Sequence, residues 1–416
     1  MHRHFNEPTN PDVLAFHEAF ADIVALLQHF TIPAVLENEI SHTRGNLEEE
    51  SILGALAVQF GRAMGGRGAL RDAIGKVDEN GKWQRQKPDP ADYQKTLTPH
   101  ERGALLVAAV FDAFLAIYKS RSADLLRIYT GGTGVLPDGA IHPDLVRRLA
   151  AEAAKAASHV LNMCIRALDY TPPVDITFGE YLRGLITADF DLVEDDRYNY
   201  RVAFVEAFRR RGIYPPKVET LSVDTLRWQG LDYSVLSDAE DRTVRKRSQA
   251  LLKPLRRFSD ACFYLRDREA LFNSTRQQRA WLHQTLASLF KEVPAFASLI
   301  GLDSKLPFEF HALRRSLRIS PDGKPMPQIV ASLTQERALQ GGAPEQNFRG
   351  GVTLLIDLAT SSIQYAIKKS ITSMNREDQT AKFLRDARQD PLRALLLAPQ
   401  TKEPFAALHL SSDLFM

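Results

Sequence analysis

The chain has 416 residues, which is long for one domain, so we expect two or three. Its content of 44% hydrophobic and 25% charged residues is that of a globular protein, which excludes a disordered chain. A formal net charge of +2 gives no general attraction to nucleic acid or to an anionic membrane, so neither is expected as a partner. The two cysteines, Cys164 and Cys262, lie in apolar helical stretches, which indicates buried thiols in a reducing compartment.

The N-terminus carries no recognisable targeting signal. No apolar run approaches the roughly 20 residues of a membrane span, and the first residues lack the apolar centre of a signal peptide. As written, the chain is expected to be cytoplasmic, with an export signal on a missing N-terminal segment as the alternative. A strong helix is predicted within a dozen residues of Met1, which is not typical of a natural N-terminus.

The first half of the chain has the apolar spacing of helices. Residues 12–30 form a predicted amphipathic helix, and residues 48–64 a second one that ends at a glycine pair. Residues 75–98 are polar and rich in turn formers, so a surface loop is expected. Residues 100–118 are apolar almost all round, which is typical of a helix buried at the centre of a domain.

Three further helices complete the predicted N-terminal region. The first covers residues 144–169. The second opens at Thr177, with Glu180 three residues later as a capping box. The third covers residues 200–211. Residues 1–215 are therefore predicted to form an all-helical domain.

The second half has a different character. Residues 238–292 are strongly charged with apolar positions at helical spacing, and residues 308–337 alternate as a β-hairpin does. A second strand pair is predicted within residues 351–369. The fold class expected is mainly α, with a helical domain followed by a smaller α+β region, residues 216–416, that contains one or two β-hairpins.

An acidic pair on the first helix is the first candidate for chemistry. Glu18 and Asp22 are four residues apart and therefore share one helix face, beside the small residues Ala21 and Ala25. By itself this spacing is more often a solvated acidic stripe. However, NPDVLAFHEAFADIVALLQHF resembles the helix of thermolysin-like zinc metallopeptidases (gluzincins) that supplies the third zinc ligand.

The resemblance implies that Glu18 is the zinc carboxylate and that Asp22 hydrogen-bonds a ligating histidine. Zinc in a peptidase of this kind is held by two histidines and a carboxylate, with water in the fourth position. A second carboxylate orients an imidazole ligand and raises its basicity. The resemblance also implies a fold, that of the helical C-terminal domain of these enzymes.

Two further segments resemble the same family. RGALRDAIG, followed by DPADYQ, is similar to the segment whose arginine binds the substrate carbonyl, which makes Arg71 the substrate-binding candidate. TPHERGALLVAAVFDAFLAIY resembles the stretch whose histidine donates a hydrogen bond to the oxyanion, which makes His100 the catalytic candidate. The alternatives are a surface arginine at a helix end and a histidine at a helix start without a catalytic role.

The resemblance covers about half of the chain. CIRALDYTPPVDITFGEYLRGLITADFDL and YRVAFVEAFRRRGI are similar to the closing helices of the family's catalytic domain, and no catalytic residue is carried over there. No family is matched by residues 216–416, so their role stays open.

The sequence departs from the family in one decisive respect. The His-Glu-x-x-His motif, which holds two zinc ligands and the general base, is absent, since none of the eleven histidines has this context. We therefore expect an N-terminally truncated and inactive chain whose motif lies upstream of Met1. His2 and His4 lie on a terminus that would not preorganise a metal site. His29 occupies a position where calcium-binding relatives often carry an acidic ligand, so no structural calcium is expected.

The sequence leaves three possible functions open. The leading interpretation is a zinc-dependent endopeptidase that acts on peptide or protein substrates in its complete form. The second is a non-catalytic binding or scaffold protein that retains the helical fold. The third is a structural protein whose charged helices contact a partner. Truncation also predicts an exposed apolar patch at Leu14, Phe16 or Phe20, and hence poor solubility.

Overall fold

The computed structural model describes residues 7–48, 75–77, 83–85, 87–193, 195–319, 323, 325–342 and 346–389. Helix accounts for 58% of the chain, and the main sheet has four antiparallel strands. The expected mainly α fold with a smaller β region is therefore confirmed. The long helices of the first half are α1 (Asp12–His29), α2 (Pro33–His42), α6 (Pro99–Tyr129), α7 (Pro143–Ala167), α8 (Phe178–Phe190) and α9 (Tyr200–Arg210).

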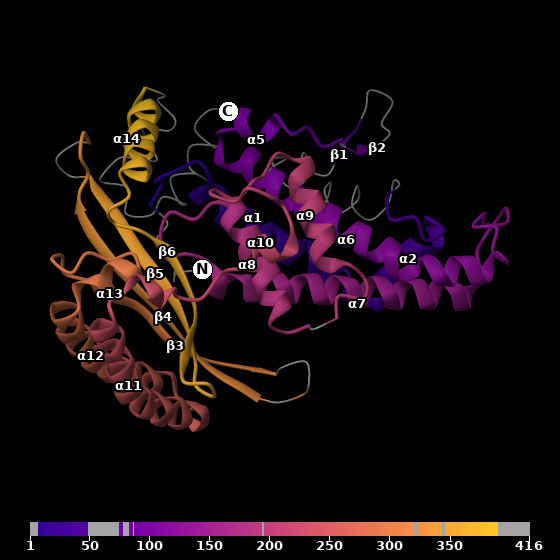
Figure 1. Ribbon diagram of the computed structural model, residues 1–416. Helices are drawn as coiled ribbons and strands as arrows, with labels where there is room; N and C mark the ends of the chain where they lie inside the picture. Colours follow the sequence, from indigo (N-terminus) through magenta and orange to yellow (C-terminus); the bar gives the residue numbers. More distant parts are fainter. Residues whose placement is uncertain are drawn as a thin grey trace.

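The second half combines a helical hairpin with a sheet. Its long helices are α11 (Asp238–Tyr264), α12 (Arg268–Glu292) and α14 (Met374–Arg388), and its strands are β3 (Glu309–Ile319), β4 (Pro325–Ala338), β5 (Asn347–Asp357) and β6 (Ser362–Lys369). The strands pair in chain order as a meander. Figure 1 shows α11 and α12 along one face of this sheet, with the helical half of the molecule beyond the sheet.

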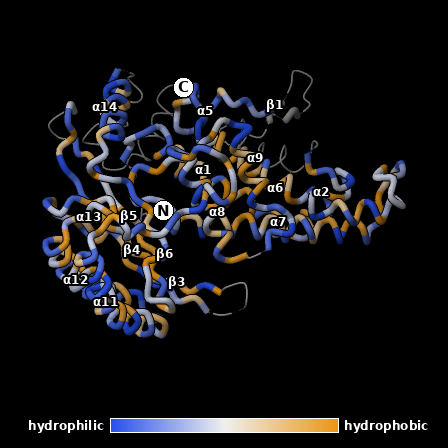
Figure 2. The backbone as a smooth tube through the Cα atoms, viewed as in Figure 1, coloured by the Kyte–Doolittle hydropathy of each residue, from blue (hydrophilic) through white to orange (hydrophobic). Residues whose placement is uncertain are grey.

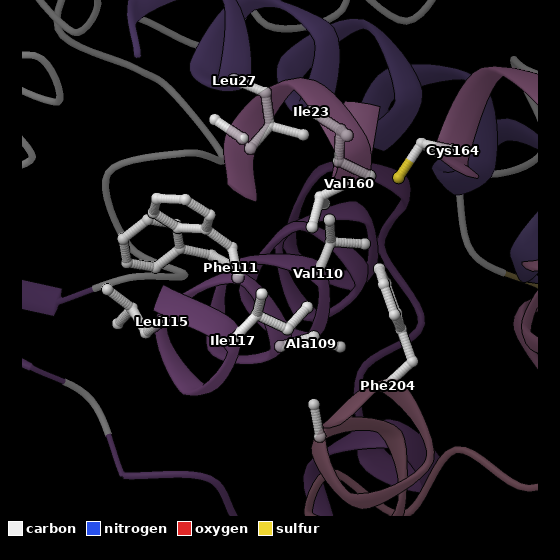
Figure 3. Packing of buried hydrophobic residues seen from close by; sticks show 14 of the residues in the cluster. Ile23, Leu27, Ala109, Val110, Phe111, Leu115, Ile117, Val160, Cys164 and Phe204 are labelled. Atoms are coloured by element: carbon white, nitrogen blue, oxygen red, sulfur yellow. The ribbon is translucent and has the colours of Figure 1, made fainter. Parts of the chain in front are cut away.

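The core of the helical half is built around α6. Its buried cluster draws on α1, α2 and on α6 to α9, and it extends as far as Leu226. Figure 3 shows Val110 and Phe111 of α6 with Ile23 of α1 and Phe204 of α9 in this cluster. The domain boundary at residue 215 stays a prediction.

The position of α6 explains its apolar sequence. Among the described residues, α6 could cross a membrane by length and composition alone, and the bent pair α1 and α2 passes the same test. In the fold, 78% of the most apolar window of α6 is buried. A helix enclosed by other helices needs an apolar surface on all sides, as expected from residues 100–118.

Two smaller clusters hold the sheet in place. One contains residues of α11, α12, β3, β4 and β5, together with the short helix α13 (Pro294–Leu299), so it fills the space between the helical hairpin and the sheet. The other joins Tyr170 and Ala188 of the helical half to Leu355 and Tyr365 of the sheet. The sheet therefore packs against helices on both faces, as a sheet buried in a domain must.

One expectation about the surface is wrong. Leu14, Phe16 and Phe20 do not form an exposed patch, because they are only 3%, 0% and 8% exposed. Phe16 packs edge-on against Tyr181 of α8, with ring centroids 4.9 Å apart. The helical half thus covers this apolar face of α1 with its own side chains.

Several predicted boundaries also change. The expected loop over residues 75–98 contains an antiparallel strand pair, β1 (Gly75–Val77) and β2 (Trp83–Arg85), and the short helix α5 (Asp92–Lys95). The helical stretch 238–292 is broken before α12, because the Asp267 side chain caps the N–H groups of Glu269 and Ala270 and starts a new helix.

The two predicted β-hairpins belong to one sheet. β4 pairs with β5 from Gln328↔Asp357 to Ala338↔Asn347, which joins the hairpin β3–β4 to the hairpin β5–β6. The predicted helix over residues 48–64 lies outside the described residues. Cys164 is buried, and Cys262 is half-buried; both are free thiols.

Candidate functional site

The site begins with a close crossing of α1 and α6. At Gly103 of α6 an added Cβ atom would lie 3.0 Å from the carbonyl oxygen of Ala15 and 3.5 Å from the backbone nitrogen of Ala19. Only glycine lets the two backbones approach this closely without a shift. The crossing brings the first turn of α6 against the middle of α1.

A histidine and a glutamate meet beside this crossing. His100 lies in the first turn of α6, and Nδ1 of His100 is 3.6 Å from Oε2 of Glu18 on α1. The side chains are 39% and 18% exposed, so both are reachable from solvent. The turn is ordered by Thr98, whose hydroxyl donates to Glu101 at 2.5 Å, and by Pro99 in the first helical position.

Asp22 lies one turn beyond Glu18 on the same face of α1 and is half-buried. Burial raises the pKa of the Asp22 carboxyl from 3.8 to about 6, and the negative charge of Glu18 adds to the increase. The negative charge of Glu18 on the same partly buried face therefore adds to the disfavouring of the ionised form of Asp22 by burial. Such a pair costs stability, which is common where a site serves chemistry or ligand binding rather than folding.

A buried ion pair fixes α1 relative to α6. Asp12, at the start of α1, contacts Arg102 of α6, and both side chains are almost fully buried. Asp12 also accepts hydrogen bonds from the Tyr93 hydroxyl at 2.6 Å and from the backbone N–H of Phe178 at 2.8 Å. One carboxylate thus ties together the starts of three helices and the segment before α6.

Arg102 completes this anchor. Its Nη1 donates to the carbonyl oxygens of Tyr93 and Thr96, at 2.6 and 2.7 Å. A buried, hydrogen-bonded ion pair fixes the position of α1 relative to α6, and His100 is only two residues from Arg102. Both residues lie within segments that resemble the peptidase family, Asp12 before Glu18 and Arg102 after His100, but neither was a predicted site residue. Gly103, a glycine inside an apolar helix, was the one signal in the sequence of a close contact.

His17, next to Glu18 in sequence, points the other way. It is 8% exposed, and burial lowers its pKa to about 4, so the imidazole is neutral at neutral pH. Successive helix residues are about 100° apart around the axis, which separates His17 from the Glu18 face. His17 is therefore part of the packed interior of the helical half.

The described residues bring together three of the four predicted site residues. Glu18 lies beside His100 at the α1–α6 crossing, Asp22 lies one turn along α1 from Glu18, and Arg71 lies outside the described residues. Their catalytic roles stay predictions. Within the part of the chain that the structure describes, no group of three or more His, Cys, Asp or Glu side chains could hold a metal ion. A catalytic zinc needs three protein ligands, and the described residues alone do not supply such a set.

Comparison with models of protein families, with characterised proteins and with solved structures gives no match to this chain.

Proposed function

We propose that this chain is the downstream part of the catalytic region of a thermolysin-type zinc endopeptidase. The observation that supports the proposal is the contact between Glu18 and His100, with Asp22 one helix turn away. The two acidic residues and His100 come from segments 78 residues or more apart in the chain. Each segment resembles, by its own local sequence, a different part of the catalytic region of these peptidases.

The proposal gives each side chain a task that suits its surroundings. Glu18 is partly exposed and is the carboxylate ligand. Asp22 accepts a hydrogen bond from the imidazole of a ligating histidine, which would also offset the burial that raises the pKa of the Asp22 carboxyl. His100 donates to the oxyanion that forms when the peptide carbonyl is attacked, and its 39% exposure leaves it accessible to a substrate.

The 416 residues do not make a working metal centre by themselves. Glu18 is one of three protein ligands that a catalytic zinc requires, and the His-Glu-x-x-His motif is absent from the sequence. Catalysis therefore needs a further segment that carries both histidines and the general base. Peptide hydrolysis is accordingly proposed for the complete protein only.

The reading frame upstream of the Met1 codon is the first test. The proposal expects an in-frame His-Glu-x-x-His before Met1, and a frame without it would contradict the proposal. In that case the helical fold would belong to a non-catalytic binding or scaffold protein.

The second test measures hydrolysis of a fluorogenic peptide by the product of the whole reading frame. Replacing His100 by Ala should lower kcat by about 10²- to 10³-fold with little change in KM, because the lost donor acts on the transition state. The control is His42→Ala, at an exposed histidine of α2. Unchanged kcat in the His100 variant would refute the assigned role.

A further inference from the structure

A cavity lies between the helical hairpin α11–α12 and the sheet, far along the chain from Glu18 and His100. Its volume is about 220 Å³, and its lining comes from α11, α12, α13 and all four strands β3 to β6. Figure 2 shows α11 and α12 alternating between hydrophilic and hydrophobic residues, as amphipathic helices do. Their apolar sides and the apolar face of the sheet enclose the cavity.

The interior of the cavity is apolar. Its wall is made of aliphatic and aromatic side chains that are less than a tenth exposed, among them Val244, Leu255, Leu289, Phe296 and Leu333. A cavity with such a wall offers no hydrogen-bond partners, so water gains little from entering it. An alkyl chain would find dispersion contacts on every side.

The polar side chains of the lining come mainly from α11 and from the turn between β5 and β6. Ser248 and Gln249 of α11 line the cavity, as do Ser361 and Ser362 after β5, and all four are half-buried or exposed. Arg256 of α11 holds the turn by donating to the Ser361 hydroxyl at 2.8 Å. It also donates to the carbonyl oxygen of Leu358 at 2.9 Å. Hydroxyl and amide groups therefore make up part of the lining, and Arg256 orders the turn that carries two of them.

α11 places a positively charged residue in the lining of the cavity. Residues 242–257 of α11 contain seven arginine and lysine residues and no acidic residue. Arg245 lines the cavity and lies over the ring of Tyr233 at 5.3 Å. It contacts Asp241 through Nε, which leaves the two terminal nitrogens of the guanidinium facing solvent at an exposed position. A guanidinium fork of this kind matches a carboxylate.

The size of the cavity limits the ligand. An engineered apolar cavity of about 150 Å³ binds benzene, which has six carbon atoms. In proportion, 220 Å³ accommodates about nine carbon atoms. This is the length of a medium-chain alkyl group.

We propose that this cavity binds a medium-chain monocarboxylate. The alkyl chain lies among the leucines between α11, α12 and the sheet. The carboxylate lies at the mouth, where the Arg245 guanidinium donates to it. The proposal is independent of the peptidase assignment, because it uses no residue of the helical half.

Calorimetric titration of the purified 416-residue chain with decanoate tests the proposal. We expect one site per chain, with affinity reduced about tenfold by Arg245→Gln, since loss of one charge-assisted contact at a partly exposed site is of this order. Arg242→Gln, on an exposed neighbour outside the cavity lining, should leave the affinity unchanged. Ala331→Phe, which fills the cavity from β4, should abolish binding.

Methyl decanoate distinguishes a free acid from an esterified acyl chain without altering the protein. It should bind about tenfold more weakly than decanoate, because it keeps the chain and lacks the charge. Equal affinity for the ester would overturn the carboxylate assignment. Absence of decanoate binding, or full binding by a folded Ala331→Phe variant, would overturn the cavity as the site.

Discussion

Replacing Asp22 by Asn should stabilise the protein at neutral pH, although a substitution in a functional site usually does the reverse. The change keeps the shape of the side chain and removes its charge. In the folded protein that charge lies half-buried on α1, one turn from Glu18. In the unfolded chain the same carboxylate is solvated, so the charge is unfavourable only in the folded state.

The size of this stabilisation follows from the pKa of Asp22, which burial and the charge of Glu18 raise from 3.8 to about 6. A carboxyl with a raised pKa in the folded state favours folding most below pH 3.8, and this contribution is lost as the pH rises through about 6. This increase in the pKa corresponds to at most about 3 kcal/mol in the free energy of unfolding. Because partial exposure to solvent screens the charge, the expected effect is about 1–3 kcal/mol. Asp22→Asn should recover this free energy at pH 8 and almost none at pH 4.

Urea denaturation of both proteins at pH 4, 6 and 8 measures the effect as a change in the midpoint at constant slope. Asp124→Asn, at an exposed carboxylate of α6, is the control and should change the free energy of unfolding by less than about 0.5 kcal/mol. A destabilised Asp22→Asn variant at pH 8, or an equal change at pH 4 and pH 8, would refute the reasoning.

Three further predictions concern the scaffold of the site. Gly103→Ala should raise the unfolding rate and lower Tm, because the new Cβ would lie 3.0 Å from the carbonyl oxygen of Ala15; an unchanged Tm by circular dichroism would contradict the close crossing. Arg102→Met should cost about 3–5 kcal/mol in urea denaturation, since it leaves the buried carboxylate of Asp12 unpaired, and a loss below about 1 kcal/mol would show that water reaches Asp12. Phe16→Ala should lower the free energy of unfolding by about 3–5 kcal/mol in the same assay, because Phe16 is fully buried. A small loss would indicate that Phe16 is exposed and would contradict this packing.

Local patterns in the sequence were sufficient to predict most helices of the first half. The capping box at Thr177 and Glu180 is present as expected, and it starts α8. The apolar run after His100 is the buried helix α6, which continues to Tyr129 rather than ending near residue 118. The extension is amphipathic and polar on one side, so it has no sharp end in the sequence.

Such local patterns could not predict the contacts between distant segments. The pairing of β4 with β5 joins two hairpins that each look complete by themselves, and the strand pair within residues 75–98 has too few residues to show an alternating pattern. The cavity under α11 depends on how two amphipathic helices meet a sheet, which no single segment encodes.

In the candidate site, too, the local features could be predicted from the sequence and the long-range contacts could not. The four-residue spacing of Glu18 and Asp22 sufficed to place both on one face of α1. The contact of Glu18 with His100 depends on the α1–α6 crossing, which Gly103 permits and the buried pair of Asp12 and Arg102 holds. Apart from the glycine at position 103, no local pattern indicated that these segments of α1 and α6 meet.

Zinc content tests the central claim most directly. The product of the whole reading frame, dialysed and analysed for metal, should contain about one zinc per chain, as a single catalytic site requires. Glu18→Gln should reduce this to well below one, while Glu219→Gln, at an exposed loop position, should leave it unchanged. Equal zinc content in the Glu18→Gln variant, or none in the unaltered protein, would contradict the assignment of Glu18 as a metal ligand.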